Sequence, residues 1–151
     1  MVDNNHSNIC KRCGGYCCKL GGTLATKSEV DRIIAAGYPN QFIEITENCY
    51  VTDFGKELVC PYLKDSTCEI YHIRPLLCQK YPIFSTDGEE HFLVHCPLTQ
   101  HLSKDDLTQC IEAALEVPEE IFTSIQRFMA PFGSKIDGRM RKFRMEPIVL
   151  E

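Results

Sequence analysis

The feature that most constrains this chain is a dense group of cysteines near its N-terminus. Cys10, Cys13, Cys17 and Cys18 fall within nine positions, in the pattern CxxC-x3-CC. The surrounding segment 10–22 is polar and contains four glycines, which permit sharp turns and close approach of the backbone. We therefore expect this segment to be an irregular loop folded around a bound group.

Ten cysteines in 151 residues hold either disulfides or metal. Residues 1–9 lack the apolar core of a signal peptide, and no stretch approaches the ~20 apolar residues of a membrane helix. We expect a cytoplasmic protein with no membrane segment, and in a reducing compartment cysteine clusters are more often metal or redox sites. The net charge of −5 argues against a general nucleic-acid binder.

The composition predicts a single α+β domain over residues 1–151. Residues 10–97 are expected to be a small, irregular cysteine-rich region organised by metal, with short strands. Residues 103–132 are predicted to be a C-terminal helical pair, and residues 133–151 a basic tail. No linker and no internal repeat divides these zones.

The spacing of Thr26 and Glu29 is that of a capping box, which predicts a helix over about residues 27–36. Alternating apolar residues predict short strands at 43–45, 50–52 and 58–59, with the segment 53–56 as the hairpin turn between the last two. From Cys60 to Cys96 frequent prolines predict short turns and helical pieces.

Two amphipathic helices are predicted in the last third. The first starts at Ser103, and its apolar stripe comprises Leu107, Cys110, Ile111, Ala114 and Leu115. The second starts at Val117-Pro118-Glu119-Glu120 and carries Ile121, Ile125 and Phe128. The basic residues of the tail, Arg139, Arg141, Lys142 and Arg144, could contact RNA or an acidic partner, but such a tail is more often solvated or folded back on an acidic face.

Four further motifs follow the opening cluster: CPYL at 60–63, CEIY at 68–71, RPLLCQKYP at 74–82 and CP at 96–97. In this order they closely resemble the YkgJ-type cysteine-cluster family, whose domain is described as zinc- or iron-chelating. The resemblance covers about residues 10–97. It implies that the metal ligands are Cys10, Cys13, Cys17, Cys18, Cys60, Cys68, Cys78 and Cys96. Three residues, and not the usual two, separate Cys13 from Cys17, and the Gly14-Gly15 pair can absorb the extra residue in the turn.

The nature of the metal stays open on the sequence. Eight thiols are twice the four ligands of one structural zinc or one [4Fe–4S] cluster, so two sites are possible. Thiolates favour zinc, Cu(I) and iron–sulfur over magnesium, calcium and manganese. Because the chain has at most one regular CxxC pair, the spacing mildly favours an iron–sulfur cluster over zinc.

The sequence leaves the roles of several residues near the motifs undecided. Cys110 is predicted to be a small buried apolar residue, whereas Cys49 could approach the site as an extra ligand. His72 and His95 are the histidines closest to motif cysteines and could bind the metal. Because the thiols are already numerous enough to be the ligands, a role as hydrogen-bond partners of the ligands is favoured. The other histidines are expected at the surface: His6, His91 and His101.

The motif RPLLCQKYP places charged and aromatic side chains beside Cys78. Pro75 should keep Arg74 extended, and its guanidinium could bind a substrate carboxylate or, the favoured alternative, pair with Glu69 or Asp65. Residues 81–82 are predicted to pack beside the site. Basic residues also flank the opening cluster, where they would lower thiol pKa values or merely form a solvated loop: Lys11, Arg12 and Lys19.

The sequence therefore predicts a metal-binding protein, and two alternatives remain. One is a cluster-dependent redox or methyl-transfer enzyme, since the cysteine region also looks like that of flagellin lysine methylases. The other is a metal storage or delivery protein. The sequence contains no phosphate loop, dinucleotide-binding fingerprint or evident nucleophile–base pair, so catalysis and any protein partner stay open.

Overall fold

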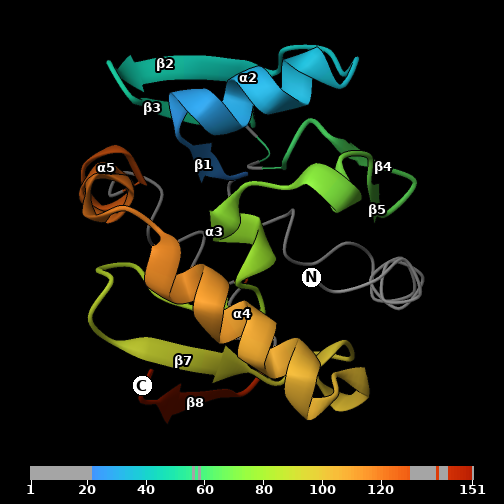
Figure 1. The fold of residues 1–151 in the computed structure, drawn as a ribbon, viewed down its shortest axis with the longest axis vertical. Helices are drawn as coiled ribbons and strands as arrows, with labels where there is room; N and C mark the ends of the chain where they lie inside the picture. The colour runs from blue at the N-terminus through green and yellow to red at the C-terminus, as the bar shows by residue number, and fades with distance from the viewer. Residues whose placement is uncertain (1–21, 56, 58, 130–138, 140–142, 151) are drawn as a thin grey trace.

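The structure, a computed structural model, describes residues 22–55, 57, 59–129, 139 and 143–150. These residues form an α+β fold with a small antiparallel sheet at each end of the molecule and a short helix, α3, between them (Figure 1). The opening cysteine segment, and most of the basic tail's charged residues, lie outside the described residues.

The first sheet has the strand order β1-β3-β2. Its strands are β1 (Leu24–Ala25), β2 (Phe42–Thr46) and β3 (Cys49–Thr52). Helix α2 (Lys27–Ala35) lies beside this sheet (Figure 1). The predicted capping box is present, because the Thr26 side chain accepts from Glu29 N and the Glu29 side chain accepts from Thr26 N. The helix predicted at 27–36 is thus confirmed.

The hairpin predicted at residues 53–56 is wrong. Strand β3 turns back on β2 through residues 47–48, and its other edge pairs with β1, so that Val51 lies between Ile43 and Leu24. Both edges of β3 are therefore occupied, and Val59 does not pair with this strand. Val59 N instead donates to Phe54 O at 3.2 Å and closes a loop.

The middle of the chain consists of short pieces, as the prolines predict. Strands β4 (Leu63–Lys64) and β5 (Thr67–Cys68) form a tight hairpin whose turn residues, Asp65 and Ser66, have φ of 50° and 62°. This positive φ at both central residues is typical of a two-residue hairpin turn. The 3₁₀ helix η2 (Tyr71–Ile73) and helix α3 (Leu76–Gln79) follow.

The second sheet has the order β6-β7-β8. It comprises β6 (Ile83–Phe84), β7 (His91–Val94) and β8 (Met145–Ile148), and the 3₁₀ helix η3 (Thr99–His101) follows β7. Strand β8 comes from the predicted basic tail, so this part of the tail is neither a solvated segment nor folded on the acidic residues. Strand β8 pairs with β7, and the pairing runs from His91 opposite Ile148 to Val94 opposite Met145. This non-local pairing decides the conformation of residues 145–148.

The predicted helical pair is α4 (Lys104–Glu116), capped by Ser103, and α5 (Glu119–Met129). Helix α4 crosses the face of the second sheet (Figure 1). Its stripe differs from the prediction at one position, since Leu115 is 60% exposed whereas Ala113 is buried. Helix α5 places Ile121, Ile125 and Phe128 against the apolar cluster of the first sheet, as predicted.

None of the helices in the described part of the chain is both long and apolar enough to span a membrane.

Candidate metal centre

Three of the predicted ligands, Cys60, Cys68 and Cys78, lie in one region of the structure. Cys60 and Cys68 belong to the apolar cluster that contains Ile33 and Tyr62. Both interact electrostatically with Cys78, which reaches them from α3. Thus a turn, a strand and a short helix each supply one sulfur to the same region.

Tyr62 anchors the turn that carries Cys60. Its side chain is fully buried, its hydroxyl donates to Pro39 O at 2.6 Å, and the same hydroxyl accepts from Gln41 N at 3.1 Å. Glu69 N donates to Tyr62 O at 2.8 Å, which ties the residue after Cys68 to the same turn. The CPYL motif thereby fixes Cys60 and Cys68 relative to the first sheet.

Glu29 holds the helix that carries Cys78. Its carboxylate is buried and accepts from Leu76 N at 2.7 Å, while its other oxygen accepts from Thr26 N at 3.0 Å. Because α3 has only four residues, its first N–H groups depend on outside acceptors. The residue that caps α2 therefore also orients α3, a second role that the capping-box pattern does not reveal.

Cys78 is half-buried as a residue, but its sulfur is enclosed. Burial raises the pKa of the Cys78 thiol well above its usual range, and the neighbouring Cys60 and Cys68 raise it further. A hydrogen bond with the Thr23 side chain and the charge of Arg74 lower the pKa in part. A thiol in these surroundings stays neutral until a cation stabilises its thiolate, which is how thiol sites couple metal binding to proton release.

Thr23 links this site to the start of the described chain. It is 4% exposed, its N–H donates to Thr52 Oγ1 at 2.9 Å, and Thr52 N donates back to Thr23 O at 3.0 Å. Gly22, immediately before it, has φ of +75°, and a Cβ there would collide with Thr52 Oγ1. The backbone that follows the opening cysteine segment is therefore held firmly beside Cys78.

Two buried cations flank Cys78. Arg74 Nε donates to Tyr71 O at 2.9 Å, Arg74 Nη1 donates to Cys78 O at 3.5 Å, and the guanidinium lies 4.0 Å above the centre of the Tyr71 ring. Lys80 Nζ donates to Ile83 O at 2.8 Å. Burial lowers the pKa of Lys80 to about 8, and Cys78 partly offsets that shift. Arg74 is extended before Pro75, as predicted, but it makes neither predicted ion pair with Glu69 or Asp65 in this part of the structure.

Cys96 lies in a different apolar cluster, with Val94 and Leu98, after β7. Its sulfur is 3.6 Å from Thr99 Oγ1, and the residue is 2% exposed. Cys96 is not among the electrostatic partners of Cys78. The structure thus groups three of the four predicted ligands that it describes, and places the fourth elsewhere.

The two cysteines outside the motifs are core residues. Cys49 is fully buried in the cluster of the first sheet, and Cys110 is 1% exposed, with its sulfur 3.6 Å from Tyr81 O. Burial raises the pKa of Cys110 to about 11. The predicted role of Cys110 as a small buried apolar residue is confirmed, and Cys49 packs against Val51 and Phe54.

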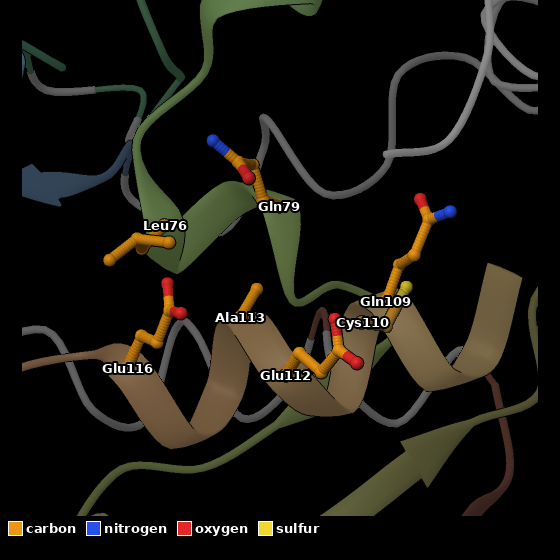
Figure 2. A pocket seen from close by; sticks show the side chains of 7 residues that line it. All are labelled: Leu76, Gln79, Gln109, Cys110, Glu112, Ala113 and Glu116. Carbon is orange, nitrogen blue, oxygen red and sulfur yellow. The ribbon is translucent and has the colours of Figure 1, made fainter.

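A pocket of about 160 Å³ lies between α3 and α4. Glu112 and Glu116 extend from α4, and Glu116 points toward Leu76 of α3 (Figure 2). Of the residues that line the pocket, one is a cysteine, Cys110. The chemistry of this pocket is therefore acidic and apolar, and differs from that of the thiol region.

The histidines near the motifs contact other groups. His72 is exposed, with Nε2 3.3 Å from Tyr38 Oη, and His95 Nε2 is 3.7 Å from Glu146 Oε1. His91, expected at the surface, is half-buried, and its Nε2 is 3.1 Å from Gly88 O. His101 is exposed as predicted. His6 lies outside the described residues.

The described residues do not complete a metal site by themselves. Within them, no three Cys, His, Asp or Glu side chains are grouped closely enough to hold a metal ion. Cys10, Cys13, Cys17 and Cys18, together with the basic residues Lys11, Arg12 and Lys19, lie outside the described part of the chain. The donor chemistry of the three grouped thiols nevertheless fits zinc or iron, because buried thiolates are the ligands that these metals take in structural sites and clusters.

Sequence reasoning missed three residues of this region. Thr23 and Glu29 act through contacts with residues far along the chain, and only the fold could reveal those contacts. Lys80 belongs to the RPLLCQKYP motif, and a lysine two positions after a ligand was a visible signal.

Comparison with known proteins supports the same region. A family model named CxxCxxCC, with the description "Putative zinc- or iron-chelating domain", matches residues 9–110. No curated protein and no solved structure matches the chain. The family match covers more than half of the chain and includes all eight predicted ligands, and its description supports metal binding. This protein belongs to the CxxCxxCC family of zinc- or iron-chelating domains.

Proposed function

We propose that the chain binds metal at a thiolate centre whose ligands come from Cys10, Cys13, Cys17, Cys18, Cys60, Cys68, Cys78 and Cys96. The observation that carries the proposal is that Cys60 and Cys68 share one apolar cluster and both act electrostatically on Cys78, which comes from a separate helix. Burial and the two neighbouring thiols raise the pKa of Cys78 and so disfavour its ionisation, and a bound cation removes that penalty.

Thr23 supports participation of the opening cluster. Cys18 precedes Thr23 by five residues, so chain connectivity alone keeps the two within about 18 Å. Since the Thr23 side chain bonds with the Cys78 thiol, the opening cysteines are within reach of the three grouped sulfurs. Cys96, which lies in another cluster, would serve a second site or join after a local rearrangement.

For the metal we propose an iron–sulfur cluster, [4Fe–4S], in preference to zinc. The support is the irregular spacing of the thiols, since zinc sites commonly have two regular CxxC pairs and this chain has at most one. The test is anaerobic purification of the full chain, followed by metal and acid-labile sulfide quantification and an absorption spectrum. Iron with stoichiometric sulfide and broad visible absorbance supports the cluster; zinc without sulfide overturns the choice of metal, and no retained metal overturns the proposal itself.

The chain offers a control cysteine for testing the ligands. Cys78→Ser should lose most of the bound metal, because a serine oxygen replaces a thiolate beside Cys60 and Cys68. Cys110→Ser, the same substitution at a buried cysteine on α4, should retain the metal of the wild type. Metal content per folded protein is the readout. Equal metal content in the two variants would contradict the placement of the centre.

A further inference from the structure

Arg74 and Lys80 are the two buried cations of the described chain, and neither pairs with a carboxylate there. Their residues are 7% and 3% exposed. The ion pairs within the described residues belong to other cations, Lys27, His95 and Arg144. The contacts of Arg74 and Lys80 are instead backbone carbonyls and the rings of Tyr71 and Phe84.

A buried positive charge without an anionic partner is costly, and proteins seldom keep one unless something compensates it. Carbonyl oxygens and aromatic faces compensate only part of a full charge. Both cations bracket Cys78: Arg74 reaches its carbonyl oxygen at 3.5 Å, and Lys80 follows it by two residues. Both also interact with Cys78 electrostatically.

Cysteine binds metal as its thiolate, so a metal bound in this region brings negative charge with its ligands. A site with four thiolates and one divalent metal carries a net charge of about −2, and burial makes that excess charge expensive. We infer that Arg74 and Lys80 are the built-in counter-charges of the thiolate centre and offset the negative charge that metal-bound sulfurs bring into the fold. This inference rests on the proposed metal centre and deepens it: the centre carries excess negative charge.

The effect of Lys80 can be separated from packing with three substitutions. Lys80→Gln removes the charge but keeps a donor for Ile83 O, Lys80→Met removes both, and Lys80→Arg keeps the charge. Lys27→Met is the control for loss of an exposed lysine, since Lys27 is 60% exposed. Two quantities are measured on each full-length variant: unfolding of the metal-free protein in urea, and metal retention in competition with a chromogenic chelator. The metal is Zn²⁺, or iron with sulfide if the wild type carries a cluster.

The neutral variants are expected to lose metal affinity without losing stability in the metal-free state. Lys80→Gln and Lys80→Met should bind metal roughly 10- to 100-fold more weakly, as expected for loss of one neighbouring charge at an effective dielectric constant of about 20. Their metal-free forms should be as stable as the wild type or more stable, because an uncompensated buried charge is gone. Lys80→Arg and Lys27→Met should bind within about threefold of the wild type.

Two results overturn the inference while leaving the metal centre in place. One is wild-type metal affinity in Lys80→Gln. The other is a parallel loss of metal-free stability and affinity in both neutral variants, which indicates a packing role. If the wild type itself binds no metal, the proposed function and this inference fail together, and that failure appears before any variant is made. Should Lys80→Met not fold, Lys80→Gln carries the test alone.

Discussion

At the scale of single residues, the described cysteines are distinguished by whether other thiols lie near them. Cys49 and Cys110 lie in apolar clusters, with Ser124 hydrogen-bonded to Cys49 and Arg74 acting on Cys110, whereas Cys78 lies near two other thiols as well as a hydroxyl and two cations. A free thiol serves well as a small apolar residue, but its ionisation depends on charges and donors nearby. Neighbouring thiols therefore identify the candidate ligand, since a hydroxyl or a charge also lies near the core cysteines.

Cys110 should give the metal-free protein a pH-dependent stability. Burial is the main cause that raises its folded pKa to about 11 from the ordinary thiol value of 9.0, so the folded state favours the neutral thiol. That stabilisation is present below about pH 9 and is lost as the pH rises toward 11, because the unfolded chain releases its proton first. The loss should reach at most about 2–3 kcal/mol, since one pKa unit is about 1.4 kcal/mol.

Urea unfolding of wild type and Cys110→Ala, both metal-free and reduced, measures this effect. The difference in free energy of unfolding between the two should be constant from pH 7 to 8 and should then shrink or reverse by about pH 10–11. Cys49 is present in both proteins, so the effect of its ionisation on the free energy of unfolding cancels in the difference. A difference that stays constant across the whole range would show that the thiol proton of Cys110 is not linked to folding.

At the scale of elements, short pieces in the middle of the chain depend on contacts with longer ones. Helix α3 has four residues, too few to be stable alone, and its start is held by Glu29 from α2. The β4–β5 hairpin is equally short, and Tyr62 attaches it to residues 39 and 41. The element that presents Cys68 is thus held by the Tyr62 side chain, which bonds to the backbone just before β2, and the element that presents Cys78 by the Glu29 side chain of α2.

Substitution of Glu29 should test this dependence. Glu29→Ala leaves the buried Leu76 N–H without its acceptor and removes half of the capping box, which should cost about 2–3 kcal/mol. Glu29→Gln keeps an acceptor oxygen and should cost about 1 kcal/mol. Glu112→Ala, at an exposed site on α4, should change stability by less than about 0.5 kcal/mol.

The measurement is urea unfolding of the metal-free variants, together with their metal content after purification. Because α3 carries Cys78, Glu29→Ala should also retain less metal than Glu29→Gln. If Glu29→Ala unfolds like Glu112→Ala, the bond to Leu76 N does not hold the helix.

At the scale of the whole molecule, the structure contains one apolar core without motif cysteines and others that include them. The core of the first sheet joins Leu24, Val51 and Ile121. The neighbouring clusters include Cys60, Cys68 or Cys96 among their members. Loss of a metal should therefore loosen the clusters that include motif cysteines more than it loosens the core of the first sheet.

Removal of metal should produce a localised loss of order. After chelation, amides of residues 60–80 should lose protection from hydrogen exchange by about tenfold or more, because the short elements there lose their common attachment. Amides of β2 and β3 should keep most of their protection. Mass-spectrometric exchange before chelation, after it, and after metal is restored measures both regions; uniform loss of protection across the chain would contradict this division.

Local patterns predicted the parts of the fold that local physics decides. The capping residues Thr26 and Ser103 and the periodic apolar residues of α4 and α5 were sufficient to place three helices. The hairpin at 53–56 failed and strand β8 was not predicted because strand pairing is non-local: β1 occupies the edge of β3, and β8 joins β7. No short-range signal in 58–59 or 145–148 reveals which edge is available.

The sequence by itself determined the family, because the order of short cysteine motifs is a property of the chain alone. It also distinguished Cys110 from the motif cysteines, since helical periodicity assigns a residue to an apolar face. Only the tertiary structure decided which thiols share a region and what surrounds them. Cys60, Cys68 and Cys78 meet, while Thr23, Glu29, Arg74 and Lys80 enclose or orient Cys78, because burial and charge depend on distances in space that sequence separation does not fix.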